Sequence, residues 1–169
     1  MGVLTNLEPA SVFHYFEEIC SIPHTSHHEK ALSDYCVQFA KAHGLACRQD
    51  EMGNVLIKAP ATPGYENQPA LILQGHLDMV GDKTAACPLD LEKDAIQLVV
   101  DGDYVRAEGT TLGGDDGIAV AYALAVLRGG GPAGCICHGA FRSGRSPAHQ
   151  HRLGGRGGAD RRLCRRTPR

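Results

Sequence analysis

Near the amino terminus, apolar residues recur at helical spacing and predict two amphipathic helices. The first lies between Pro9, a residue suited to an early helical position, and Pro23, which ends it. The second lies between Ser26, which forms a capping-box pattern with Glu29, and Gly44. The residues at helical spacing are Val12, Phe13, Phe16, Ile19 and Cys20 in the first helix, and Leu32, Tyr35, Cys36, Phe39 and His43 in the second.

After residue 44 the period changes to that of short strands. Residues 45–50 and 55–58 form one predicted pair, joined by a turn at residues 52–54. Residues 98–105 form a second pair around the Asp-Gly-Asp of residues 101–103. Both pairs are typical of β-hairpins.

Two segments are apolar without alternation. Residues 70–73 (Ala-Leu-Ile-Leu), ended by Gly75, are typical of a parallel strand that is buried on both faces. Residues 117–127 are apolar almost all round, which is typical of a buried helix. The order helix, helix, strands, helix predicts an α/β layer fold, of which this chain holds only the first part.

Charge divides the sequence after residue 127. Residues 1–127 hold 7 Lys and Arg against 18 Asp and Glu, a net charge of −11, whereas residues 128–169 hold ten Arg and a single acid, Asp160, a net charge of +9. We therefore expect a folded part over 1–127 and a disordered Arg- and Gly-rich tail over 128–169. The Arg, Gly, Pro and Ala content without Lys is typical of GC-rich DNA read out of frame, which favours a truncated product, or a sequencing error, of a longer gene.

Composition excludes a membrane-spanning protein and argues against secretion. No apolar run approaches the roughly 18–20 residues that a membrane helix needs. Residues 1–8 lack the basic start and apolar stretch of a secretory signal. In a chain without a secretory signal, seven cysteines are expected to be reduced thiols, so we expect a cytoplasmic protein.

His76 and Asp78 follow the apolar strand and form the first cluster with candidate chemistry. Residues two apart in an extended chain point the same way, and the carboxyl ends of strands are where open α/β sheets bind ligands. A neutral imidazole is a good zinc ligand, and a neighbouring carboxylate can accept its second N–H. A His-x-Asp tripeptide is common by chance, however, and alone it more often has only a structural role.

Asp115 and Asp116, flanked by glycines at the start of the apolar helix, form the second cluster. Two adjacent carboxylates are costly to bury without a cation, although a helix N-terminus offsets part of the charge. The alternative is a solvated turn in which Asp caps the helix. Taken with His76, these carboxylates make a donor set for a divalent metal, which would polarise a carbonyl and lower the pKa of a bound water.

Four stretches carry a resemblance to a known family: residues 16–23 (FEEICSIP), 52–55 (MGNV), 73–80 (LQGHLDMV) and 109–119 (GTTLGGDDGIA). From about Leu7 to Leu127, the sequence resembles the aminoacyl-histidine dipeptidases. These are also called beta-alanyl-histidine or cytosol non-specific dipeptidases, and they belong to a larger group of two-zinc peptidases. The last two stretches, in this order, are the most specific.

The resemblance implies the amino-terminal portion of a zinc-peptidase catalytic domain that hydrolyses dipeptides, notably Xaa-His, by a zinc-activated water. It implies two zinc ions in a complete site, with cobalt or manganese as substitutes. His76 would be a terminal ligand of one ion and Asp115 would bridge both, with a cis peptide bond between Asp115 and Asp116. Asp78 would act in catalysis by orienting His76. The full-length family also suggests a homodimer.

The chain departs from the family pattern after the apolar helix. The family needs a Glu-Glu pair, a further Asp, a late His and a lid-like domain, but no Glu follows Glu108 and Asp160 is the only later acid. The sequence therefore holds roughly half of a site, and the alternative to an active dipeptidase is an inactive fragment.

The Arg- and Gly-rich tail suggests two other roles. Residues 154–158 and 128–130 resemble Arg-Gly-Gly segments that bind nucleic acid, but Phe141 is the only aromatic residue there and stacking platforms are missing. Residues 135–138 (Cys-Ile-Cys-His), with Cys164, could form half a zinc knuckle, but the tail has no convincing second pair of ligands.

Overall fold

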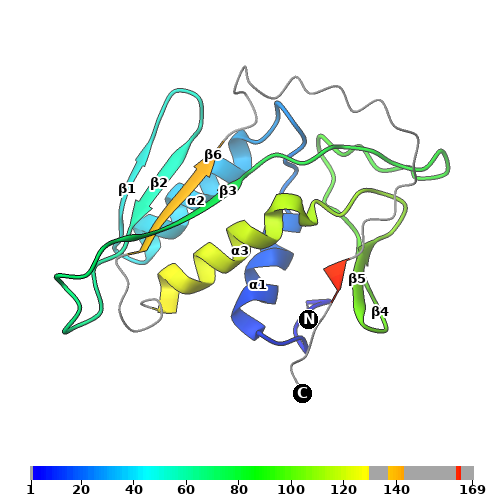
Figure 1. The fold of residues 1–169 in the computed structure, drawn as a ribbon. Helices are drawn as coiled ribbons and strands as arrows, with labels where there is room; N and C mark the ends of the chain where they lie inside the picture. Colours follow the sequence, from blue (N-terminus) through cyan, green and yellow to red (C-terminus); the bar gives the residue numbers. More distant parts are fainter. Residues whose placement is uncertain (1, 130–136, 143–162, 165–169) are drawn as a thin grey trace.

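The computed structural model describes residues 2–129, 137–142 and 163–164 and has a mixed α/β fold (Figure 1). This confirms the predicted fold class. The elements in chain order are α1 (Ala10–Cys20), α2 (Lys30–Ala42), β1 (Ala46–Gln49), β2 (Val55–Lys58), β3 (Leu71–His76), β4 (Leu98–Asp101), β5 (Tyr104–Ala107), α3 (Gly114–Gly129), β6 (Cys137–Arg142) and β7 (Leu163–Cys164).

The described strands form two sheets. The larger sheet has the order β1-β2-β6-β3, and the smaller has the order β4-β5-β7. The two predicted hairpins, β1 with β2 and β4 with β5, are antiparallel as expected. β3 pairs with β6 in parallel, from Leu71 opposite Cys137 to His76 opposite Arg142. His76 is thus the last residue of a parallel strand, at its carboxyl end.

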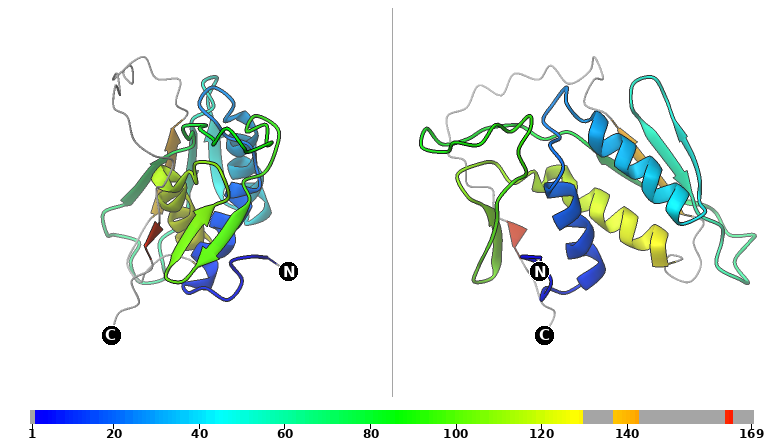
Figure 2. Two further views of the ribbon diagram at one scale, coloured as in Figure 1. Left: turned by 90° about the vertical axis from the view of Figure 1, so that its right-hand side faces the viewer. Right: turned by 180° about the vertical axis from the view of Figure 1, so that it is seen from behind.

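All three helices lie on one face of the larger sheet, as the views from the side and from behind show (Figure 2). α2 packs against β1 and β2, α3 packs against β3 and β6, and α1 packs on α3. The start of α3 therefore lies beside the carboxyl end of β3.

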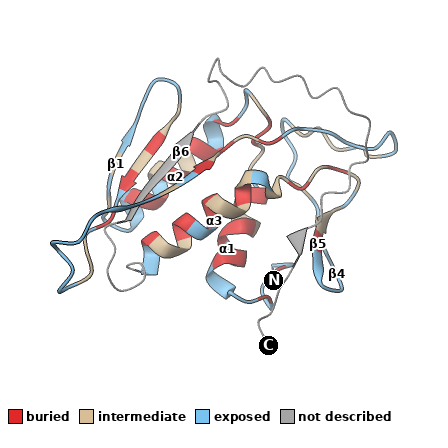
Figure 3. Cartoon of the chain, in the orientation of Figure 1, coloured by how far each residue is buried: buried red, intermediate tan, exposed pale blue. Residues whose placement is uncertain are grey.

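The hydrophobic core lies between the helices and the sheet (Figure 3). The five apolar residues predicted for the first helix, Val12, Phe13, Phe16, Ile19 and Cys20, are all buried. The core also includes Leu32 from α2, Ile57 from β2 and Leu124 from α3, each with no exposed surface. Burial of a side chain of this size contributes roughly 1.5–3 kcal/mol, so this layer of contacts holds the helices on the sheet.

Two predictions about burial are wrong. In β3, Leu71 and Ile72 are 42% and 65% exposed. Adjacent strand residues point to opposite faces, so the start of this edge strand is covered on neither face in the described residues. β3 also continues through Gly75 to His76 instead of ending at Gly75. In α3, Tyr122 is 50% exposed, so this helix is not buried all round.

Most of residues 128–169 lie outside the described residues, including residues 154–158 and the start of the candidate zinc knuckle. The expected boundary after residue 127 and the shifted reading frame therefore stay predictions. Within this tail the structure has β6 and β7, neither of which the sequence predicted. β6 is placed by backbone pairing with β2 and β3. Among the described helices, none has the length and apolar character to cross a membrane.

Candidate metal centre

The two predicted clusters meet where β3 ends and α3 begins. His76 Nε2 lies 3.2 Å from Asp115 Oδ1, although the two residues are 39 positions apart in the sequence. The close approach depends on Gly75, because a Cβ atom there would lie 3.2 Å from both Asp116 Oδ2 and Val120 Cγ2. A glycine at the end of β3 thus lets the strand rest on the first turn of α3.

The His76 ring is oriented by Asp78 in two ways. Nδ1 lies 2.8 Å from the backbone carbonyl oxygen of Asp78 and 3.3 Å from its carboxylate oxygen Oδ1. Nδ1–H can therefore donate to Asp78, which leaves Nε2 facing Asp115. The sequence predicted the carboxylate as partner. The structure adds the carbonyl, whose contact is shorter and does not depend on the side chain.

Asp78 is in turn held by Ser26, a residue that sequence reasoning assigned elsewhere. Ser26 Oγ donates a hydrogen bond of 2.7 Å to Asp78 Oδ2. The predicted capping box is wrong, because α2 starts after Glu29 without a side-chain cap hydrogen bond in the described part of the chain. No local pattern reveals the contact, since 52 positions separate Ser26 from Asp78.

The side chains of Asp115 and Asp116 lie in different environments. The peptide bond between them is cis, as the family resemblance implies, and both residues have non-helical φ and ψ, so the regular part of α3 starts at Gly117. The Asp116 carboxylate accepts a hydrogen bond of 3.3 Å from the His76 backbone N–H. The Asp115 side chain is 72% exposed beside His76. Asp116 thus ties α3 to β3, whereas Asp115 faces the open side.

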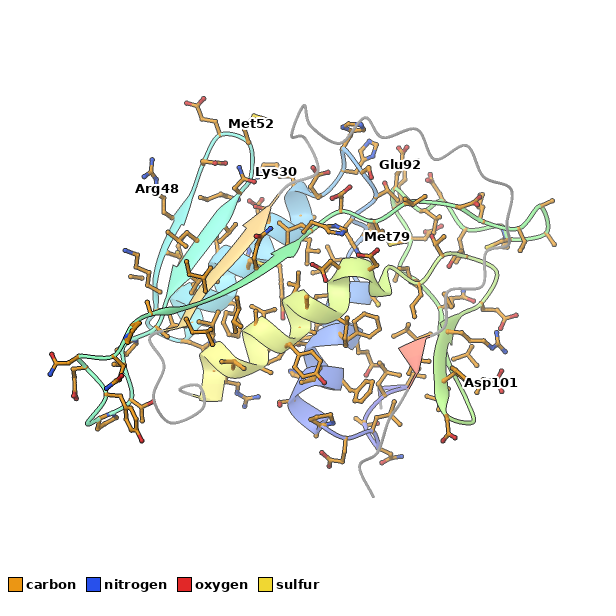
Figure 4. All side chains as sticks on the ribbon, viewed as in Figure 1. Lys30, Arg48, Met52, Met79, Glu92 and Asp101 are labelled. Atoms are coloured by element: carbon orange, nitrogen blue, oxygen red, sulfur yellow. The ribbon has the colours of Figure 1, made fainter. Side chains whose placement is uncertain are left out.

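The segment that follows β3 also supports the turn before α3. Gly113 has φ of +72°, and a Cβ atom there would lie 2.8 Å from Met79 Sδ and 3.3 Å from Nε2 of the buried His24. Met79 is labelled in Figure 4, above the first turn of α3. The backbone on either side of the pair His76–Asp115 is therefore packed tightly.

Two carboxylates contact the His76 imidazole, a third accepts from its backbone N–H, and together they give the site a negative field. The Asp78 carboxylate, followed by that of Asp115, raises the pKa of His76 to about 9. The His76 ring, with the Ser26 hydroxyl, lowers the pKa of Asp78 to about 2. Burial raises the pKa of Asp116. In the metal-free chain this pKa favours the protonated imidazole at neutral pH, and a metal ion would replace the proton on Nε2.

His76 and Asp115 fit a partial set of metal ligands. Two ligands at about 2.0–2.1 Å from a tetrahedral zinc ion are roughly 3.3 Å apart, close to the observed 3.2 Å between Nε2 and Oδ1. Among the described residues, no group of three or more His, Cys, Asp or Glu is arranged to hold a metal ion. Within this part of the chain, His76 and Asp115 are therefore a pair of potential ligands and not a complete metal site.

Comparison with known proteins finds two similar proteins, and both are named as dipeptidases. The chain is 49% identical over 127 residues to the cytosol non-specific dipeptidase of Escherichia coli, a match that covers 75% of this chain and 26% of that protein. The crystal structure of aminoacylhistidine dipeptidase from Vibrio alginolyticus matches with a TM-score of 0.81 and 42% identity, over 86% of this chain and 30% of that one. No protein-family model matches the chain.

More distant structures share the fold alone. A tripeptidase from Staphylococcus aureus has a TM-score of 0.63 at 20% identity, and an aminopeptidase from Bacillus cereus has a TM-score of 0.61 at 17% identity. This chain spans between a quarter and a third of the length of the two dipeptidases. In sequence and in fold, the chain is therefore similar to the amino-terminal portion of the aminoacyl-histidine dipeptidases, as its motifs predicted.

Proposed function

We propose that this chain carries part of the catalytic site of a metal-dependent dipeptidase, with His76 and Asp115 as metal ligands and Asp78 as the residue that orients His76. The observation that carries the proposal is the 3.2 Å contact between His76 Nε2 and Asp115 Oδ1, from two motifs far apart in the sequence. The names of the two dipeptidase relatives support the substrate class.

Zinc is the metal that this donor set suits best among common cellular ions, because imidazole nitrogen and carboxylate oxygen are both frequent zinc ligands. Bound there, the ion would supply Lewis-acid polarisation of a peptide carbonyl and a water of lowered pKa. The residues of this chain have three tasks. His76 would give up a proton to bind the ion, Asp78 would hold the other side of the imidazole ring, and the Asp115 carboxylate would supply a second ligand.

The proposed substrates are small dipeptides, including those with histidine in the second position. One relative is named for its action on aminoacyl-histidine and the other as non-specific and cytosolic. A cytosolic location and a homodimer of the full-length protein belong to the same proposal. The alternative of a nucleic-acid-binding fragment depends on residues outside those described.

Hydrolysis of a β-alanyl-histidine substrate by the full 169-residue chain, loaded with zinc, tests the proposal. We expect free histidine to appear above the rate of His76→Ala and Asp115→Ala. Asp103→Ala is the matched control, because it removes an exposed carboxylate from the turn between β4 and β5. A zinc-loaded wild-type chain that releases histidine no faster than His76→Ala would contradict dipeptidase activity of this chain.

A further inference from the structure

The loop between α1 and α2 makes a tight turn directly beside the Asp78 carboxylate. The turn spans Thr25 to His28 and is closed by a hydrogen bond of 2.8 Å from the His28 N–H to the Thr25 carbonyl. Ser26 is its second residue, and its hydroxyl reaches Asp78 Oδ2 at 2.7 Å.

Backbone hydrogen bonds fix this turn against the segment that follows β3. The Met79 N–H donates to the His24 carbonyl and the Ser26 N–H donates to the Met79 carbonyl, both at 3.0 Å. Thr25 itself is buried, and a Cβ atom at Gly81 would lie 2.6 Å from its Cγ2 atom. The Ser26 backbone is therefore held in place, and from there its hydroxyl lies 2.7 Å from Asp78 Oδ2 and 3.4 Å from the Met79 carbonyl oxygen.

His27 adds a second, independent sign that the turn is constrained. Its φ of +76° makes it the single non-glycine residue with positive φ in the described part of the chain. A non-glycine residue in this region costs of order 1–3 kcal/mol and persists where the surroundings over-determine it, most often near functional sites. The strained position directly follows the serine that contacts Asp78.

We infer that Ser26 is a positioning residue for the proposed metal site: its hydroxyl fixes one oxygen of Asp78 so that the other faces the His76 ring. The inference rests on the proposed function. The two carboxylate oxygens have different partners, since Oδ2 accepts from Ser26 and Oδ1 lies 3.3 Å from His76 Nδ1. Without the hydroxyl, the carboxylate is free to rotate about its Cβ–Cγ bond, and the Asp78 backbone carbonyl is then the one fixed partner of His76 Nδ1 among the described contacts.

Cobalt(II) binding to the full chain tests this inference, with affinity and the visible absorption spectrum as readouts. Removal of a group that directly supports a ligand typically costs about 10–100-fold in metal affinity, so Ser26→Ala, one step further out, should cost about 3–10-fold. Ser26→Thr should restore the affinity because it keeps the hydroxyl. Ser21→Ala is the control, since the hydroxyl of this exposed serine of the same loop donates to the Glu18 carbonyl.

Asp78 substitution decides whether Ser26 acts through that residue. In an Asp78→Ala background, Ser26→Ala should cause no further loss of cobalt affinity, and the unfolding midpoint confirms that each variant is folded. Equal cobalt affinity in wild type and Ser26→Ala, or the same loss with and without Asp78, would overturn the inference. A wild-type chain that binds no cobalt would instead overturn the proposed function on which the inference depends.

Discussion

At the residue scale, the site is one imidazole placed among carboxylates whose pKa values are shifted in different directions. Asp78 and Asp115 contact the two ring nitrogens of His76 directly, and Asp116 accepts from its backbone N–H. An imidazole held in this way favours its protonated form in the absence of metal. A zinc ion must therefore displace a proton that the protein holds more tightly than usual.

This arrangement predicts an unusual titration of His76 in the metal-free chain. Because the pKa is raised to about 9, the ring stays charged at pH values where an ordinary histidine, with a pKa of about 6.5, has lost its proton. Its contribution to stability is present in full below pH 6.5 and is lost as the pH rises through about 9. Nuclear magnetic resonance of the ring nitrogens measures the midpoint directly.

Asp78→Asn supplies the matched variant for that titration. The midpoint of His76 should move down toward 6.5, because the largest cause of its elevation is the Asp78 carboxylate. The ring should keep its orientation, since the Asp78 backbone carbonyl remains 2.8 Å from Nδ1. A wild-type midpoint near 6.5 would contradict the electrostatics described for the site.

At the element scale, the junction of β3 with α3 determines whether His76 and Asp115, the proposed metal ligands, meet. Gly75→Ala would place a Cβ atom 3.2 Å from Asp116 Oδ2 and Val120 Cγ2, so these side chains would have to shift by a few tenths of an ångström. We expect a loss of about 1–3 kcal/mol in the free energy of unfolding, as for other overpacked positions, together with weaker zinc binding. Chemical denaturation and zinc titration measure the two effects.

Gly129→Ala is the control for this substitution, because a Cβ atom there meets nothing within 4 Å. It should leave both the unfolding free energy and the zinc affinity close to those of wild type. Unchanged zinc affinity in Gly75→Ala would mean that the strand–helix junction does not set the distance between His76 and Asp115.

The periodicity of apolar residues was sufficient to predict the helices and hairpins, but it did not predict which faces of them other elements cover. Helical spacing predicted α1 and α2, and the turn residues predicted both hairpins. The burial of β3 was predicted wrongly, because an apolar run cannot reveal whether a second layer covers the sheet. Backbone pairing placed β6, whose residues show no apolar period.

The site itself was only half predictable. Residue chemistry and local spacing pointed to His76, Asp78 and Asp115, because each lies in a short motif at the end of an element. Ser26 was missed because its partner is 52 positions away and because the neighbouring sequence favoured a role in helix capping instead. Contacts between distant loops depend on packing, which no local pattern contains.

At the scale of the whole molecule, the described part of the larger sheet has helices on one face and exposed apolar residues on the other. Ile72 is 65% exposed on β3, whereas Ile57 on β2 is fully buried. Exposed apolar surface of this kind favours self-association. Isoleucine on β2 therefore stabilises the core, whereas isoleucine on β3 adds to the exposed apolar surface.

Substitution at the two isoleucines tests this description. Ile72→Lys should change the free energy of unfolding by no more than about 0.5 kcal/mol and should reduce self-association. Ile57→Ala should cost about 2–5 kcal/mol, because it leaves a cavity in the core. Denaturant titration and analytical ultracentrifugation measure these outcomes, and a large loss of stability in Ile72→Lys would show that the outer face of β3 is covered.

The central claim is that this chain binds a metal ion through His76 and Asp115, and calorimetric titration of the full chain with zinc tests it most directly. The account predicts saturable binding by wild type and by Asp103→Ala. It also predicts binding at least about tenfold weaker in His76→Ala and in Asp115→Ala, since each loses a direct ligand. Equal zinc affinity in wild type and His76→Ala would contradict the account.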